Sequence, residues 1–252
     1  MKKKIFILTI IFLFAVIYLT PAKLVENLMP ANPKVQVSGL SGSIWSGNIA
    51  NISWNQLTLS DVEFALSPVS LLMAKISLAL NFPANGDLAG QVEANLPDTS
   101  GKSITISNAN LTIDSALIQQ LIPMPGVLVN GKVQTKNLDL ETANNKLVSA
   151  QGDIIWRNAS VAISGQDWQL GEFVVKAETR DKTNIIVFEI VDAKKNKLDL
   201  LGKATISPDG MMEFVGSVGI NIDQNIYNAI SMFSNGKPID GRLPIKYRQK
   251  IN

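Results

Sequence analysis

The chain contains neither cysteine nor histidine among its 252 residues. It therefore cannot build a Cys/His zinc site, a thiol nucleophile or a catalytic triad that uses an imidazole base. A cysteine-free chain suits oxidising and reducing compartments alike, so disulfides say nothing about its location. Most familiar hydrolase mechanisms are excluded, and we expect no enzyme activity, catalytic residue, cofactor or metal site.

The chain also has little net charge, since 23 basic and 21 acidic residues leave +2. This balance gives no broad basic surface and predicts no nucleic-acid partner. The glycines between Ser38 and Gly47 lack the lysine of a phosphate-binding loop. The acidic residues Asp139, Glu141 and Asp192 fall in polar stretches typical of solvated surface. Nothing here singles out a catalytic group.

The first twenty residues give an expected location. Three lysines at positions 2–4 precede an uncharged apolar run from Ile5 to Leu19. The positive-inside rule places the lysines in the cytoplasm and the rest of the chain across the membrane. A cleaved signal peptide is the alternative, but Thr20 and Ala22 around Pro21 make a poor cleavage site. We therefore predict a cytoplasmic tail, a transmembrane anchor and a juxtamembrane segment at residues 1–4, 5–22 and 23–33.

From Lys34 onward the sequence is typical of a mainly β fold. Strand-like segments of about five to twelve residues are separated by Gly, Asn, Asp and Pro. Within them, apolar residues such as Leu57 and Leu59 stand two positions apart. This pattern predicts an antiparallel sheet with one wet face. The run Ile185–Val191 is apolar on both faces, so it is expected either to be sandwiched or to line a hydrophobic groove.

Three short stretches have apolar residues three and four positions apart, as in helices. They span Ser67–Met73, Asp114–Ile122 and Asp223–Phe233, and each begins at a Ser or Asp suited to capping a helix. We expect these helices to plug the ends or cover a face of the sheet. Partner-binding helices are the alternative.

The chain also shows an internal offset of about 110 residues. Gly126 and Gly131 repeat at Gly236 and Gly241, and Trp45 repeats at Trp156. Several such matches in one order predict two similar β-rich halves, residues 34–143 and 144–252. No Pro/Ser-rich linker separates them, so one continuous curved sheet is favoured over two independent domains.

The stretch Ser38–Trp54 combines three glycines with two tryptophans, and residues 152–170 form a weaker copy. Both stretches are typical of short strands joined by tight glycine turns. The tryptophans are expected to pack in the core across neighbouring glycines. Ligand contact and membrane anchoring are the alternatives.

Together, these features resemble the type II secretion system protein N family. The matching elements are the basic start and single span, then Pro21, Ala22, Leu24 and Val25, the motif at Leu40–Gly47 and the later Ser67–Leu72. The resemblance implies a non-enzymatic inner-membrane protein with a periplasmic β domain. The family offers no agreed functional residue, so we expect a structural role for the motif residues Gly42, Trp45, Ser46 and Gly47.

The resemblance leaves two functions open. In the first, the periplasmic domain is a scaffold that binds other inner-membrane and periplasmic components of the secretion machinery. In the second, suggested by a distant likeness to AsmA-type proteins, a curved sheet forms a groove or sandwich that binds or transports phospholipid. Fold-level likeness alone does not decide between them.

Overall fold

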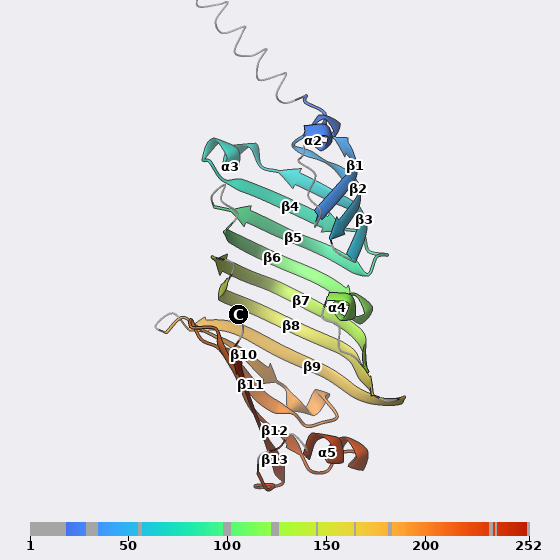
Figure 1. Cartoon of the computed structure of the whole chain (residues 1–252), viewed down its shortest axis with the longest axis vertical. Coiled ribbons are helices and arrows are strands. Elements are labelled where there is room, and N and C mark those ends of the chain that lie inside the picture. The colour runs from blue at the N-terminus through green and yellow to red at the C-terminus, as the bar shows by residue number, and fades with distance from the viewer. Residues whose placement is uncertain are drawn as a thin grey trace, which may run out of the picture.

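The computed structural model describes residues 19–28, 35–54, 57–97, 102–121, 126–144, 146–163, 165–180, 183–231, 234 and 236–250. Within them, 13 strands form one antiparallel sheet (Figure 1). The strand order in the sheet is the order in the chain, from β1 to β13, so the sheet is a continuous meander. The mainly β prediction and the preference for one continuous sheet are confirmed. Of the two alternatives, groove and sandwich, the sandwich does not fit, because the described strands form one sheet.

The strands differ greatly in length, and short helices connect some of them. The strands are β1 (Val35–Gly42), β2 (Ser46–Trp54), β3 (Leu57–Leu66), β4 (Ile76–Phe82), β5 (Leu88–Leu96), β6 (Ser103–Asp114), β7 (Val127–Ala143), β8 (Lys146–Ile163), β9 (Gln166–Arg180), β10 (Ile185–Val191), β11 (Leu201–Ile206), β12 (Met211–Gly219) and β13 (Arg242–Lys250). The helices are α2 (Ala22–Leu28), α3 (Pro68–Leu72), α4 (Ser115–Leu121), α5 (Gln224–Ser231) and the 3₁₀ helix η1 (Ala193–Lys195).

The predicted transmembrane anchor lies almost entirely outside the described residues, which begin at Leu19. The cytoplasmic tail at 1–4 and residues 29–33 of the predicted juxtamembrane segment lie outside them too. Among the residues that are described, no helix has the length and apolar character needed to cross a bilayer.

The three helices predicted from the sequence are confirmed, and their capping residues act as expected. The Ser67 side chain accepts a hydrogen bond from Ser70 N at 3.3 Å at the start of α3. Asp114 Oδ1 accepts from Ala116 N at 3.0 Å at α4, and Asp223 Oδ1 from Asn225 N at 2.9 Å at α5. Each side chain satisfies an N–H that the first helical turn leaves unpaired.

Strand length differs from the prediction in the middle of the sheet. β7, β8 and β9 have 17, 18 and 15 residues, longer than the predicted maximum of about twelve. Residues 152–170 were predicted as short strands joined by glycine turns, yet β8 runs without interruption through Gly152. Gly152 (φ 132°) and Asn158 (φ 50°) are positions of positive φ inside the strand. Pairing with β9 shifts register after Trp156, next to Asn158, so the strand bends at a bulge there and continues.

The core is a row of buried side chains on one face of the sheet. Every strand from β2 to β10 contributes one residue of this apolar row, namely Ile49, Val62, Phe82, Val92, Ala109, Leu138, Ala150, Ala177 and Ile186. Cross-strand partners share a face, and the pairs Ile49–Val62 and Ala109–Leu138 belong to the row. At about 4.8 Å per strand spacing the row extends roughly 40 Å.

A second cluster continues the core toward the C-terminal end. Its buried members are Ala159, Leu170, Phe173, Leu198, Val218, Ile226 and Leu243, so α5 and β13 pack on the ends of β8 and β9. The Trp156 ring stacks on Phe173 with centroids 5.6 Å apart. Trp54, in contrast, is 47% exposed, so the expectation of core tryptophans is wrong for that residue.

The proposed equivalence of residues 34–143 and 144–252 stays a prediction. Gly131 lies inside β7 with φ 114°, whereas Gly241 immediately precedes β13 with φ 72°. Trp45 immediately precedes β2, and Trp156 lies within β8. α4 and α5 share one relation to the sheet, because each connects two successive antiparallel strands, β6 to β7 and β12 to β13.

Candidate functional site

The motif residues Gly42, Trp45, Ser46 and Gly47 are brought together in the turn between β1 and β2. Gly42 pairs with Gly47 at the base of this turn. Ser43 holds the turn closed, because its N–H donates to Ser46 O at 2.9 Å and its Oγ accepts from the Trp45 and Ser46 N–H groups at 3.2 Å. The motif is thus a compact, internally bonded turn, and its structural role stays a prediction.

Glycine is needed at positions 42 and 47 of the turn for two different physical reasons. Gly42 has φ 89°, a left-handed conformation in which a side chain is strained. Gly47 has no such φ, but a Cβ added there would lie 1.9 Å from Ser41 O. The backbone of β1 therefore approaches Gly47 so closely that a larger residue would push the two strands apart.

The turn fastens two other parts of the chain to the sheet. Ile44 N donates to Thr20 O at 3.0 Å, and Pro21 forms a β-bridge with Ser43. On the other side, Leu66 N donates to Trp45 O at 2.7 Å, just before α3. The residues that follow the predicted anchor and the residues that lead into α3 are therefore hydrogen-bonded to neighbouring positions of one turn.

Helix α2 adds a second attachment along β1. The Glu26 carboxylate accepts hydrogen bonds from Gly39 N at 3.2 Å and Leu40 N at 3.0 Å, and Ala22 is buried. Gly39 has φ 70°, and the pairing of β1 with β2 is interrupted at Gly39 and Ala50 without a shift of register. We call the Ser43–Ser46 turn, Thr20, Pro21 and α2 the N-terminal junction.

Sequence reasoning missed Glu26. Its only signal was an acidic residue between the apolar run and the first strand, which does not reveal a partner 13 positions away. Gly39 adopts a left-handed conformation within β1, next to the two N–H groups that donate to Glu26, and this conformation within a strand is not expected for a glycine assigned to a turn.

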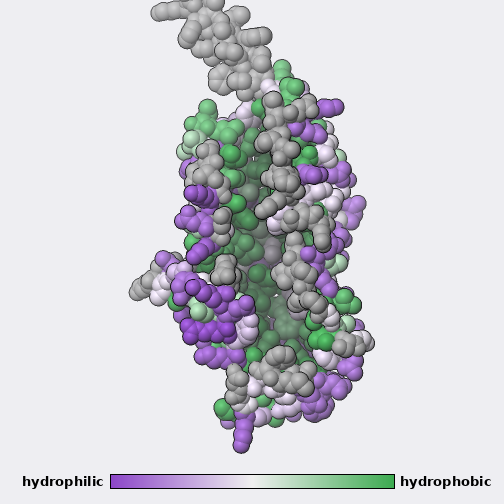
Figure 2. Space-filling model, in the orientation of Figure 1, coloured by the Kyte–Doolittle hydropathy of each residue, from purple (hydrophilic) through white to green (hydrophobic). Residues whose placement is uncertain are grey.

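The face with the apolar row is hollowed and hydrophobic along its length. Figure 2 shows hydrophobic side chains following the middle of this face between hydrophilic margins. Partly buried side chains such as Leu80, Ile106 and Phe188 pack against the row. The run Ile185–Val191 lies here as β10, where Ile186 and Val187 are both buried although neighbours on a strand face opposite sides.

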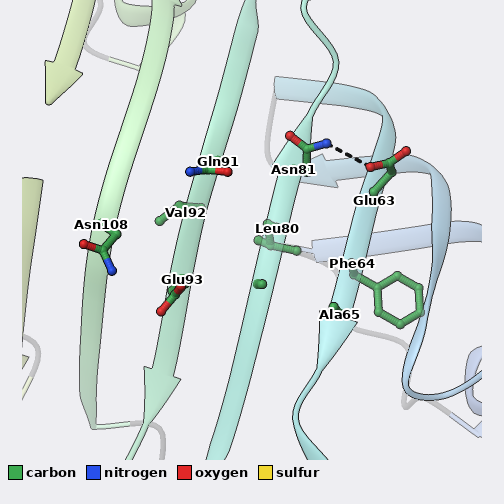
Figure 3. Close-up of a pocket in the computed structure, with 10 residues that line it drawn as sticks. Glu63, Phe64, Ala65, Leu80, Asn81, Gln91, Val92, Glu93 and Asn108 are labelled. Carbon is green, nitrogen blue, oxygen red and sulfur yellow. Dashed lines mark hydrogen bonds between the residues drawn. The ribbon is translucent and has the colours of Figure 1, made fainter. Parts of the chain in front are cut away.

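A small depression of about 250 Å³, lined by polar and apolar side chains, lies over β3, β4, β5 and β6 (Figure 3). Phe64, Leu80 and Val92 are cross-strand partners on the face of the apolar row. Glu63, Asn81 and Gln91 are also cross-strand partners, each one residue away along its strand. They therefore belong to the face opposite the apolar row. Asn81 Nδ2 donates to Glu63 Oε2 at 2.8 Å. The small side chains Ala65 and Ala79 leave the space, which offers hydrogen bonds to a polar group.

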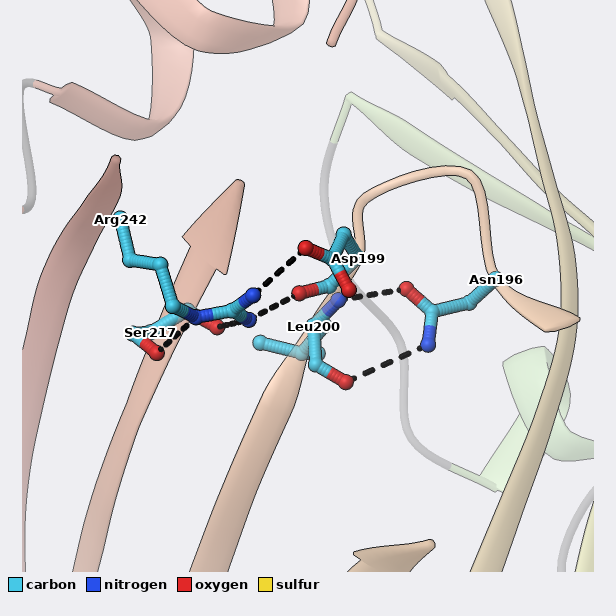
Figure 4. Close-up of polar contacts among 5 residues, drawn as sticks. All are labelled: Asn196, Asp199, Leu200, Ser217 and Arg242. Atoms are coloured by element: carbon cyan, nitrogen blue, oxygen red, sulfur yellow. Dashed lines mark hydrogen bonds and ion pairs between the residues drawn. The ribbon is translucent and has the colours of Figure 1, made fainter. Parts of the chain in front are cut away.

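At the other end of the sheet, Arg242 joins three elements (Figure 4). Its Nε donates to Ser217 Oγ at 2.8 Å and its Nη1 lies 2.5 Å from Asp199 Oδ2, while Nη2 also contacts Asp199 O. Asn196 Oδ1 accepts from Leu200 N at 2.7 Å in the same loop. The start of β13 is thereby tied to β12 and to the loop before β11.

Strand β13 exposes basic side chains beyond this tie. Lys246 Nζ lies 2.9 Å from Glu213 Oε1 on β12, and this hydrogen bond and charge lower the pKa of Glu213. Near β10, the carboxylates of Glu172 and Asp192 raise the pKa of Lys195 in the same way. Because these ion pairs are exposed to solvent, they contribute little to the free energy of unfolding.

No group of three or more metal-ligating acidic side chains lies close together in the part of the chain that the structure describes. The described residues also leave no buried polar side-chain atom without a hydrogen-bond partner. The two features that stand out are the N-terminal junction and the long apolar row, and both suit binding and positioning.

Comparison with known proteins identifies the family. The model of the family described as "Type II secretion system (T2SS), protein N" matches residues 33–243. A curated protein of Aeromonas hydrophila named type II secretion system protein N is similar over the full length of both chains, at 26% identity over 263 residues. No solved structure matches the fold. The chain therefore belongs to the type II secretion system protein N family.

Proposed function

We propose that this chain is a non-catalytic scaffold of the secretion machinery, anchored in the inner membrane by residues 5–22. Its sheet stands in the periplasm and binds other inner-membrane and periplasmic components. Family membership supports a role in the machinery. The basic start and apolar run support the anchor, and the N-terminal junction supplies a firm connection between such an anchor and the sheet.

The observation on which the scaffold role depends is the difference between the two edges of the sheet. At β1, the N–H groups of Gly39 and Leu40 are already bonded to Glu26. At β13, residues 246–250 are exposed, and no further strand pairs with them among the described residues. An unpaired strand edge is a site where a partner can add a strand of its own.

The orientation of β13 follows from two of its residues. The N–H and C=O of Arg242 bond to Ile239, and Pro244 O accepts from Ser234 Oγ at 2.7 Å. Ile239 and Ser234 both lie outside the sheet. The even-numbered residues of β13 therefore direct their N–H and C=O groups away from β12. By alternation, Lys246 and Arg248 present their N–H and C=O groups to the open edge.

The test is co-purification from cells that contain the whole secretion machinery, after mild detergent extraction. Arg248→Pro removes an outward N–H without removing a bond to β12, so the sheet should stay folded while the partner is lost. Arg248→Ala is the matched control, since it removes the charge and keeps the N–H. If the wild-type chain purifies without other secretion components, and its deletion leaves secretion unchanged, the scaffold role is wrong.

A second function, phospholipid binding, is favoured by one observation. Partly buried hydrophobic side chains packed against the apolar row line a hollowed face (Figure 2), and acyl chains prefer such a surface to water. Native mass spectrometry of the full chain released from detergent tests it. Retained phospholipid that is lost after Leu80→Asp would support binding, and a lipid-free wild-type chain would exclude it.

A further inference from the structure

The short helix α3 and the residue after it present hydrophobic side chains to the solvent. Leu72 is 83% exposed, Val69 66% and Met73 64%, with Leu71 also exposed. No residue of α3 is buried. We call Val69, Leu71, Leu72 and Met73 the apolar tip. Soluble surfaces seldom concentrate exposed apolar residues in this way, and such patches mark contact with a membrane or a partner.

The local sequence fixes this exposure. Pro68 sits at the first helical position and the Ser67 side chain caps the helix, so α3 begins at a defined point beyond the end of β3. Lys75 N bonds back to Ser70 O, which closes the turn before β4 starts at Ile76. The tip is thus a firm protrusion, and packing against the sheet does not hide it.

The position of the tip is set by the N-terminal junction. Thr20 O accepts from Ile44 N, and the next residue, Trp45, accepts from Leu66 N one residue before the cap of α3. Two hydrogen bonds and one peptide unit therefore link the end of the apolar N-terminal run to the start of α3. Figure 1 shows α2 and α3 at the same end of the sheet, opposite β13.

We propose that the apolar tip inserts into the interfacial region of the bilayer that holds the N-terminal run. The proposal rests on the membrane anchor of the proposed function and adds a second contact with the phospholipid surface. Lys23 in α2 and Lys75 shortly after α3 are exposed, and their charges complement anionic headgroups. Two contacts with one bilayer fix the tilt of the sheet, which one span cannot do.

The absence of cysteine gives a direct test. Single-cysteine variants of the full chain are labelled with an environment-sensitive fluorophore and reconstituted in vesicles of phosphatidylethanolamine and phosphatidylglycerol, with quencher lipids in the membrane. The label at Leu72→Cys should shift to the blue and be quenched by the lipids. A label at Ile239→Cys, also an exposed hydrophobic position but near β13, should show neither effect.

Leu19→Cys reports the anchor separately. Quenching at Leu19→Cys with none at Leu72→Cys would overturn the tip proposal and leave the anchor standing. An unquenched label at both positions would reject both. A label at Met73→Cys should also lose its blue shift when Val69 and Leu72 are replaced by Ser. Persistence of the shift in that variant would contradict insertion by the tip. No other protein is present, so a tip that binds only a protein partner would stay unquenched.

Discussion

The carboxylate of Glu26 accepts a hydrogen bond from the backbone N–H of Leu40 at 3.0 Å, which ties helix α2 to the edge strand β1. The same carboxylate also accepts a hydrogen bond from the backbone N–H of Gly39. Hydrogen bonds from backbone N–H groups to a charged carboxylate are stronger than hydrogen bonds between two neutral groups. This contact makes the helix and the first strand one unit at the end of the sheet nearest the N-terminal run.

Replacement of Glu26 by Ala should therefore loosen the N-terminal junction. We expect a loss of about 1–2 kcal/mol in the free energy of unfolding, since hydrogen bonds to a charged group contribute about that much at partly exposed sites. Amide hydrogen exchange at Gly39 and Leu40 should accelerate in the same variant. Glu141→Ala, which removes an exposed carboxylate of β7, is the control. Unchanged exchange at both amides would contradict the role of Glu26.

Gly47→Ala should destabilise the chain by about 2–4 kcal/mol, because the new Cβ meets Ser41 O in a strand that cannot move freely. Gly126→Ala is the comparison variant, because it introduces backbone strain without a steric contact. Gly126 has φ 76° but no atom within 4 Å of the added Cβ, so its cost should be about 1 kcal/mol. Urea unfolding of both variants measures the difference. Equal costs would show that the close approach of β1 to Gly47 is unimportant.

Much of this fold is predictable from local sequence patterns. The capping residues Ser67, Asp114 and Asp223 start α3, α4 and α5 as expected, because helix starts depend on nearby hydrogen bonds. Strand length is less predictable. Positive-φ residues such as Asn137 and Asn158 are typical of turns, yet here they lie at bulges within strands, and only pairing with a neighbouring strand distinguishes the two.

The candidate site could be predicted only in part. The motif Gly42–Gly47 could be found because glycines and tryptophans are concentrated in the short stretch Ser38–Trp54. The partners of that motif were not, since the bonds from Ile44 to Thr20 and from Leu66 to Trp45 join segments that are distant in sequence. The apolar row was missed for a related reason. Bulges change which positions face the core, so simple alternation does not list its members.

Trp156→Ala should cost about 2–4 kcal/mol in the free energy of unfolding. The ring stacks on Phe173 and its Nε1–H donates to Asn130 O at 3.0 Å, so the substitution removes packing and one hydrogen bond. Trp54→Ala is the matched comparison and should cost less than about 1 kcal/mol, because Trp54 is largely exposed. Chemical denaturation of the two variants checks the difference, and a reversed order would contradict the core assignment.

The pairing of β12 with β13 should be visible in the titration of Glu213. Lys246 lowers the pKa of this carboxyl through a hydrogen bond and charge, so NMR should find the pKa below that of an unfolded glutamate. Because the folded pKa is the lower one, the small stabilisation is present at neutral pH and is lost as the pH falls through that pKa. Lys246→Met should move the pKa back up. An unchanged pKa in that variant would place the cause elsewhere.

Site-specific photo-crosslinking at β13 tests the scaffold account most directly. A photoreactive amino acid replaces Arg248, whose backbone faces the open edge, in cells with a complete type II secretion machinery. A control probe replaces Gln151, an exposed residue of β8 in the middle of the sheet. We expect a crosslink to another secretion component from the probe at position 248. It should be absent from the probe at position 151, and absent when the probe at position 248 is combined with Lys246→Pro. Crosslinks at neither position, or equally at both, would contradict a partner bound at this edge.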